Sequence, residues 1–161
     1  MIRKLLMPIA RWLIVERPAR GKSIAILQRE MESAAEGVAE NISNGADTPE
    51  NRAQAGHIIG IEGWAQQRLR VALGEPQRDE EYDGYRPEPE LDMLALRDRF
   101  LDVRHNSLVL ASELQDEGVT PQQTVEHNDF GPVSVGGWLQ YITGHASFEA
   151  KRIKAAAPAS E

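Results

Sequence analysis

The stretch YITGHASFEAKRI, residues 141–153, has the spacing of a helix that carries His145 and Glu149 on one face. Residues four apart on a helix are neighbours, with Cβ atoms about 5–6 Å apart. A buried carboxylate is costly unless it is paired, so Glu149 needs a partner. Three arrangements supply one: an ion pair with Arg152 at the surface, a buried hydrogen bond with His145, or a metal ion held by both side chains together with His57.

A second histidine on an apolar helix face gives the metal arrangement its third ligand. His57 lies in AGHIIGIEGW, with Ile61 and Trp64 four and seven residues later, so it shares its face with apolar residues. Two ligands four residues apart on one helix and a third from a facing helix leave one position open, as in catalytic zinc sites. Spacing alone leaves all three arrangements of Glu149 open.

Outward from this stretch, apolar residues recur at helical spacing in four segments. The last segment begins at Ser134, a favourable N-cap, and Pro49 suits the first position of the second. Gly74 and Gly118 are placed to end the second and third. The expected helices cover residues 23–44, 49–73, 89–118 and 134–157.

Two long segments without helical spacing, residues 75–88 and 119–133, separate the last three helices. Strand signals are scarce, so the sequence predicts an all-α fold. Connections of this length permit crossovers, which favours a four-helix bundle with long crossover loops. We expect a lead-in segment over residues 1–19, forming a short amphipathic helix, and a helical domain over residues 20–157.

The composition restricts the class of function. The chain has 161 residues, the size of one ordinary domain, and it contains no cysteine, which excludes disulfides, thiolate metal sites and a cysteine nucleophile. Its net charge is −7, although residues 1–22 are basic. The acidic remainder argues against a nucleic-acid partner, and the apolar N-terminal run is too short to cross a membrane. We therefore expect a cytoplasmic protein with no nucleic-acid or membrane partner.

The other two histidines and the known catalytic motifs give little further support for a functional site. His105, in DVRHNS, follows a polar turn and is expected to be solvated. His127, in the segment VEHNDFG, either lines the mouth of a site or helps to fold its loop. The sequence contains no glycine-rich phosphate loop, nucleophile elbow or HExxH motif.

Two stretches resemble the DinB-like (YfiT-like) family of metalloenzymes. HNDFGPVSVGGWLQYITGHASFEAKRI, residues 127–153, resembles the C-terminal signature of that family, and GHIIGIEGW resembles the segment that carries its first metal ligand. The resemblance extends over about residues 20–155. It implies a four-helix bundle with long crossovers and a metal ion held by three histidines from the second and fourth helices.

Carried over residue by residue, the resemblance implies metal ligands at His57, His145 and Glu149. The family more often has histidine at the third position, but two histidines and one carboxylate form a chemically sound set. The implied cofactor is a divalent metal ion, Zn²⁺ or Ni²⁺. In some relatives the metal activates a low-molecular-weight thiol.

The expected function is therefore that of a metal-dependent enzyme, either a thiol-dependent transferase or a hydrolase, acting on an unidentified small-molecule substrate. The alternative is a non-catalytic stress-response or ligand-binding protein on the same bundle, with a degenerate metal site. Helical bundles of this family often pair with a second copy of the same chain. The apolar side chains Leu5, Ile9 and Trp12 of the N-terminal segment could cover a partner, which predicts a homodimer.

Overall fold

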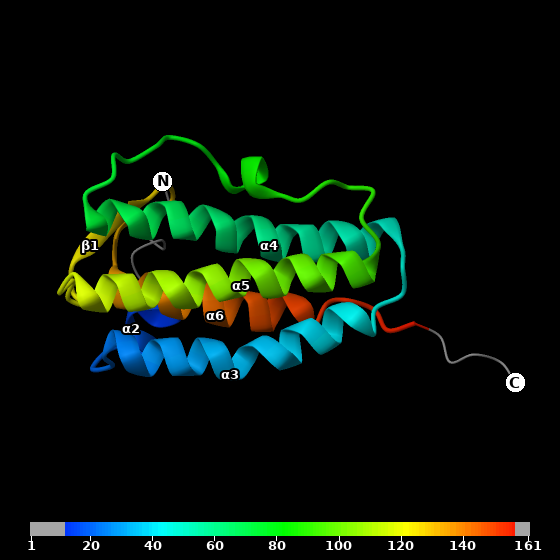
Figure 1. The fold of residues 1–161 in the computed structure, drawn as a ribbon, viewed down its shortest axis with the longest axis horizontal. Coiled ribbons are helices and arrows are strands. Elements are labelled where there is room, and N and C mark those ends of the chain that lie inside the picture. Colours follow the sequence, from blue (N-terminus) through cyan, green and yellow to red (C-terminus); the bar gives the residue numbers. More distant parts are fainter. Residues whose placement is uncertain (1–11, 157–161) are drawn as a thin grey trace, which may run out of the picture.

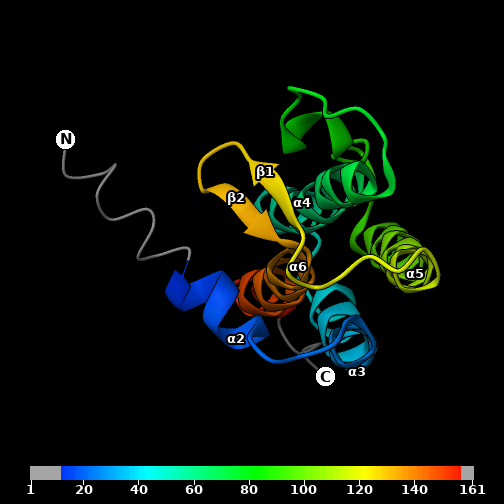
Figure 2. The ribbon, with the colours of Figure 1, turned by 90° about the vertical axis from the view of Figure 1, so that its left-hand side faces the viewer.

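The computed structural model describes residues 12–156 and is mainly helical (Figure 1). Its long helices are α3 (Ile24–Ser43), α4 (Pro49–Arg70), α5 (Met93–Asp116) and α6 (Val135–Ala150). The short turns are η1 (Trp12–Glu16), α2 (Arg17–Ala19), η2 (Val71–Leu73) and η3 (Tyr82–Tyr85). The long helices lie side by side, and α6 packs on α3, on α4 and on the N-terminal turns (Figure 2). No helix between residues 12 and 156 has the length and apolar character that crossing a membrane requires.

Each long helix begins at a side chain that accepts a hydrogen bond from the backbone N–H three residues later. These caps are Ser23, Thr48, Asp92 and Ser134. The predicted starts of the first, second and fourth helices are confirmed. The third begins at Met93 rather than near Pro89, because Asp92 provides the cap.

The helix ends also follow local chemistry. Gly74 and Gly118 adopt positive φ angles of 94° and 70°, which other residues reach only with strain, and they close η2 and the turn after α5 as the sequence predicts. The last helix is shorter than predicted: α6 ends at Ala150, and residues 151–152 form a turn. There Ala155 forms an antiparallel bridge with Gly45. The predicted end near residue 157 lies outside the described residues.

A two-stranded hairpin occupies part of the segment that the sequence predicts as a loop, so the fold is not purely α. Strands β1 (Thr124–His127) and β2 (Gly131–Ser134) pair antiparallel. Val125 and Val133 face each other across the hairpin and are buried, while their neighbours are more exposed, which is the alternation of a half-buried strand. Four residues per strand are too few to stand out from a loop in sequence.

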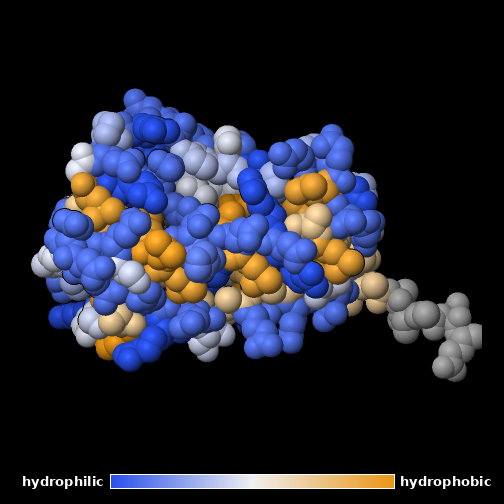
Figure 3. All heavy atoms as spheres, in the orientation of Figure 1, coloured by the Kyte–Doolittle hydropathy of each residue, from blue (hydrophilic) through white to orange (hydrophobic). Residues whose placement is uncertain are grey.

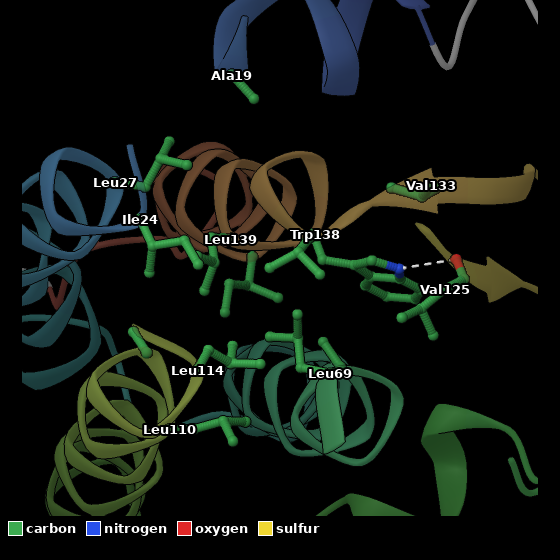
Figure 4. Packing of buried hydrophobic residues seen from close by; sticks show 14 of the residues in the cluster. Ala19, Ile24, Leu27, Leu69, Leu110, Leu114, Val125, Val133, Trp138 and Leu139 are labelled. Atoms are coloured by element: carbon green, nitrogen blue, oxygen red, sulfur yellow. Dashed lines mark hydrogen bonds between the residues drawn. The ribbon is translucent and has the colours of Figure 1, made fainter. Parts of the chain in front are cut away.

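The core consists of two apolar clusters, one nearer the hairpin and one nearer the opposite end of the helices. Trp138 is fully buried at the hairpin end, and its indole N–H donates to the carbonyl of Val125 (Figure 4). From the N-terminal turns, Val15 and Ala19 join this cluster. The predicted lead-in helix is thus represented by η1 and α2, and its residues 1–11 lie outside the described part. The face in view in Figure 3 is mostly hydrophilic, with apolar side chains scattered over it.

A buried ion pair crosses the core between α4 and α5. Arg104 donates from Nε and Nη2 to the two carboxylate oxygens of Glu62, at 2.7 and 2.9 Å, and from Nη1 to the carbonyl of Met31. Ser107 donates a further hydrogen bond to Glu62. Both charged side chains are only 1% exposed. A fully hydrogen-bonded pair of this kind fixes how the two helices meet.

Candidate functional site

The structure brings two of the three predicted site residues into contact. His57 projects from α4 and His145 from α6, and their Nε2 atoms lie 3.2 Å apart. The ring centroids are 5.0 Å apart and the planes cross at 64°. Both side chains are partly buried. The two histidines thus face each other from separate helices, as the helical spacing predicted.

The contact between the two imidazoles requires that at least one of them is neutral. Burial, and after it the adjacent His57, together lower the pKa of His145 to about 4. Burial also lowers the pKa of His57, and Arg86 contributes to that shift. At neutral pH both rings are therefore uncharged, with one Nε2 donating and the other accepting.

Glu149 lies one helical turn beyond His145, but its carboxylate is bound elsewhere. Gln54 donates to Oε2 at 2.6 Å and Arg152 donates to the same oxygen at 3.0 Å. Burial alone would raise the pKa of Glu149, but these two hydrogen bonds lower it below its usual value. Of the three arrangements that the sequence left open, the Arg152 pair is formed, with Gln54 as a second partner. The residue is nonetheless only 9% exposed, so the pair is not a purely surface one.

The two histidines fit a metal ion better than the carboxylate does. Two nitrogen ligands at about 2.0–2.1 Å from a tetrahedral zinc ion lie roughly 3.3 Å apart, close to the separation between His57 and His145. Neutral imidazole is also the form that ligates. Within residues 12–156, however, no group of three histidine, cysteine, aspartate or glutamate side chains is arranged to hold a metal ion. Glu149 does not complete such a group, because Gln54 and Arg152 bind its carboxylate by hydrogen bonds.

Two tyrosines border the histidine pair. Tyr82 of η3 meets His57 edge-on, with ring centroids 5.2 Å apart, and Tyr141 of α6 lies 5.6 Å from His145. Burial raises the pKa of Tyr141 to about 12, so its hydroxyl stays protonated. Neither tyrosine was predicted as a site residue. The signal for Tyr141 was its position four residues before His145 on the same helix.

A row of glycines on α4 allows the segment that carries Tyr82 to approach the site. Gly56, Gly60 and Gly63 follow helical spacing, and a Cβ atom at each would meet residues 82–87. At Gly60 that atom would lie 2.9 Å from Cγ of Arg86 and 3.0 Å from the carbonyl oxygen of Tyr82. The close approach explains the glycine spacing in GHIIGIEGW.

Gly60→Ala is expected to displace residues 82–87 and to destabilise the protein by about 1–3 kcal/mol, since a backbone carbonyl cannot easily give way. The matched control is Gly37→Ala in α3, where a Cβ meets nothing within 4 Å. That change should stabilise the protein by up to about 1 kcal/mol, because alanine favours helix. Urea unfolding measures both. Equal gains in stability from the two substitutions would show that the segment does not rest on Gly60.

The remaining histidines serve other roles. His127 is 7% exposed and stacks on Trp138, with ring centroids 5.1 Å apart. Its Nδ1 accepts hydrogen bonds from the backbone N–H groups of Asp129 and Phe130, so it folds the hairpin turn, the second of its two predicted roles. Its Nε2 has no hydrogen-bond partner within residues 12–156. His105 is exposed, as expected.

The buried His127 is expected to make stability fall in acid. Burial lowers its pKa to about 4, whereas histidine in an unfolded chain titrates near 6.5. Between these pH values the unfolded chain binds the additional proton, so the free energy of unfolding decreases as pH falls through this window, by on the order of 3 kcal/mol at full effect. Urea unfolding at pH 7 and pH 4.5 measures the decrease. It should be smaller in His127→Phe, and an equal decrease in both proteins would contradict the assignment.

Comparison with protein-family models, with curated proteins and with solved structures finds no significant match to this chain. The resemblance to DinB-like proteins therefore rests on the two stretches around His57 and His145.

Proposed function

We propose that this chain is a metal-dependent enzyme whose divalent ion, Zn²⁺ or Ni²⁺, is held by His57, His145 and Glu149. The observation that carries the proposal is the 3.2 Å separation of two neutral imidazole nitrogens on separate helices. Buried polar side chains of a purely structural core are more often bound to backbone groups than to each other. Here neither ring of the pair has another hydrogen-bond partner within the described residues.

We also assign the fold to the four-helix bundles with long crossover loops found in the DinB-like family. The side-by-side packing of α3, α4, α5 and α6 supports this assignment. So does the position of the histidine pair between α4 and α6, because the resemblance assigns the metal ligands to the second and fourth helices of the bundle.

A bound divalent ion would supply Lewis acidity, which lowers the pKa of a thiol or water molecule that it binds. The remaining roles at the site belong to side chains of the protein. His57 and His145 present neutral nitrogens, and Tyr82 shields one side of the pair from water. The Tyr141 hydroxyl stays protonated at neutral pH and can donate a hydrogen bond to a substrate oxygen. This set suits a transferase that uses a low-molecular-weight thiol, or a hydrolase.

The test uses untagged protein loaded with Zn²⁺ or Ni²⁺ and two model reactions. In one, N-acetylcysteine displaces chloride from 1-chloro-2,4-dinitrobenzene, forming a carbon–sulfur bond and releasing the thiol proton and chloride. In the other, water hydrolyses p-nitrophenyl acetate. We expect metal-dependent acceleration of at least one reaction, lost in His145→Ala. Protein that carries one metal ion per chain and accelerates neither would overturn the proposed activity.

The engagement of Glu149 favours a second candidate, a non-catalytic binding protein with a degenerate metal site. Gln54 and Arg152 satisfy the carboxylate without a metal ion. In this candidate the imidazoles form a simple hydrogen bond, and the protein stays free of metal in the presence of excess Zn²⁺ and Ni²⁺.

We propose, in addition, that the protein is a homodimer that pairs through its N-terminal segment. Trp12 and Leu13 of η1 are 48% and 46% exposed, and covering apolar side chains stabilises association. The other two predicted contacts, Leu5 and Ile9, lie outside the described residues. Light scattering of the whole chain should give twice the monomer mass, and Trp12→Glu should reduce it to the monomer mass. A monomer at high concentration would contradict the prediction.

A further inference from the structure

A pocket of about 370 Å³ opens between the N-terminal turns and α6, directly beside the candidate site. Figure 2 shows the blue N-terminal turns beside α6. The lining residues are Ile14 from η1 and Gln140, Tyr141, Gly144, His145 and Phe148 from α6. His145 thus belongs both to the wall of this pocket and to the contact with His57.

The lining has the character of a site for a small uncharged molecule. Ile14 and Phe148 are 64% and 65% exposed, which is unusual for large apolar side chains and leaves them available at the rim. Among residues 12–156, no aspartate, glutamate, lysine or arginine lines the pocket. The volume lies at the lower end of the range for small-molecule sites, which are typically apolar with a few convergent polar groups.

The polar groups of the lining converge on one wall. Tyr141 and His145 are adjacent, with ring centroids 5.6 Å apart. The Tyr141 hydroxyl has no hydrogen-bond partner between residues 12 and 156, so it is free to donate to a ligand. Gly144 keeps the space between Gln140 and Phe148 open, because a Cβ atom there would meet only Nε2 of Gln140, at 3.8 Å.

We propose that this pocket binds the aryl or branched-alkyl part of an uncharged small molecule, with a carbonyl oxygen of that molecule accepting a hydrogen bond from Tyr141. This orientation turns the polar end of the ligand toward His145. The assignment of this pocket to the substrate of the enzyme rests on the proposed function. The binding itself needs no metal ion, so it can be tested separately.

The probe is acetophenone, a neutral aryl ketone, and its matched charged analogue is benzoate. Titration of metal-free, isotopically labelled whole chain is followed by NMR. Saturable shifts of the Gly144 and Phe148 amide signals are expected with acetophenone, together with at least tenfold weaker binding of benzoate. Tyr141→Phe should weaken the binding of acetophenone but not that of ethylbenzene, which has no carbonyl.

Two matched substitutions separate pocket filling from general effects on the helices. Gly144→Leu fills the pocket without a clash with the core, and it should weaken the binding of acetophenone at least tenfold. Gly37→Leu places the same side chain in open space on α3 and should leave the affinity unchanged.

Three outcomes would overturn the proposal: no saturable shift, equal affinity in Gly144→Leu and wild type, or benzoate binding as tightly as acetophenone. Conversion of a dimer to a monomer by Gly144→Leu, with acetophenone affinity unchanged, would identify the pocket as an interface instead. Failure of metal binding at His57 and His145 would leave these results unaffected, so the two proposals fail independently.

Discussion

Glu62→Ala is expected to lower the free energy of unfolding by about 3–5 kcal/mol, because it leaves the guanidinium of Arg104 buried without a counter-charge. Arg104 is 1% exposed and cannot reach water without disturbing the packing of α5 against α4. Ser107 would also lose its acceptor on Glu62. Urea unfolding followed by circular dichroism measures the loss.

The exposed pair between Arg97 and Asp98 provides the control, since their side chains are 37% and 63% exposed. Asp98→Ala should change stability by less than about 1 kcal/mol. The double variant Glu62→Leu, Arg104→Met removes both buried charges and should recover most of the loss. A loss below about 1 kcal/mol in Glu62→Ala would show that Arg104 finds another partner or that water enters.

His57→Ala and His145→Ala are each expected to abolish stoichiometric binding of Zn²⁺ or Ni²⁺. Each removes one of the two histidine ligands of the proposed site, and a remaining single imidazole binds such ions weakly. His105→Ala, on the exposed face of α5, is the matched control and should bind as wild type does. Titration calorimetry measures the stoichiometry. Unchanged binding in either site variant would place the metal elsewhere.

Substitutions of Glu149 separate the arrangements that the sequence left open. If Glu149 ligates the metal, Glu149→His should keep or strengthen binding and Glu149→Ala should weaken it. If it only accepts hydrogen bonds from Gln54 and Arg152, neither change should alter metal content. A buried partner of protonated His145 would make Glu149→Ala cost roughly 3–5 kcal/mol. The low pKa of His145 and the contacts of Glu149 argue against that last arrangement.

The helices were predictable because their signals are local. A cap at Ser134 and a glycine of positive φ at residue 74 act within a few residues of the chain. The hairpin was not, because Val125 and Val133 show a period of two over only a few positions. Nor was the pair of Glu62 and Arg104, because its stability depends on the contact between α4 and α5, which no sequence spacing describes.

The contact between His57 and His145 was predictable to the same extent. Spacing on two helices and the resemblance pointed to His57 and His145, and the structure brings them together. The partners of Glu149 were only half foreseen: Arg152 lies three residues along the same helix, but Gln54 comes from α4, 95 residues away. Tyr82 reaches the site through a close approach to Gly60 that only tertiary packing defines.

The central claim is tested most directly by the amount of metal that the untagged wild-type chain binds. After incubation with excess Zn²⁺ or Ni²⁺ and removal of free ions by gel filtration, elemental analysis should find about one ion per chain, and His145→Ala treated alike should hold none. Wild-type protein that remains free of metal after both incubations would contradict the account and leave His57 and His145 as a hydrogen-bonded pair.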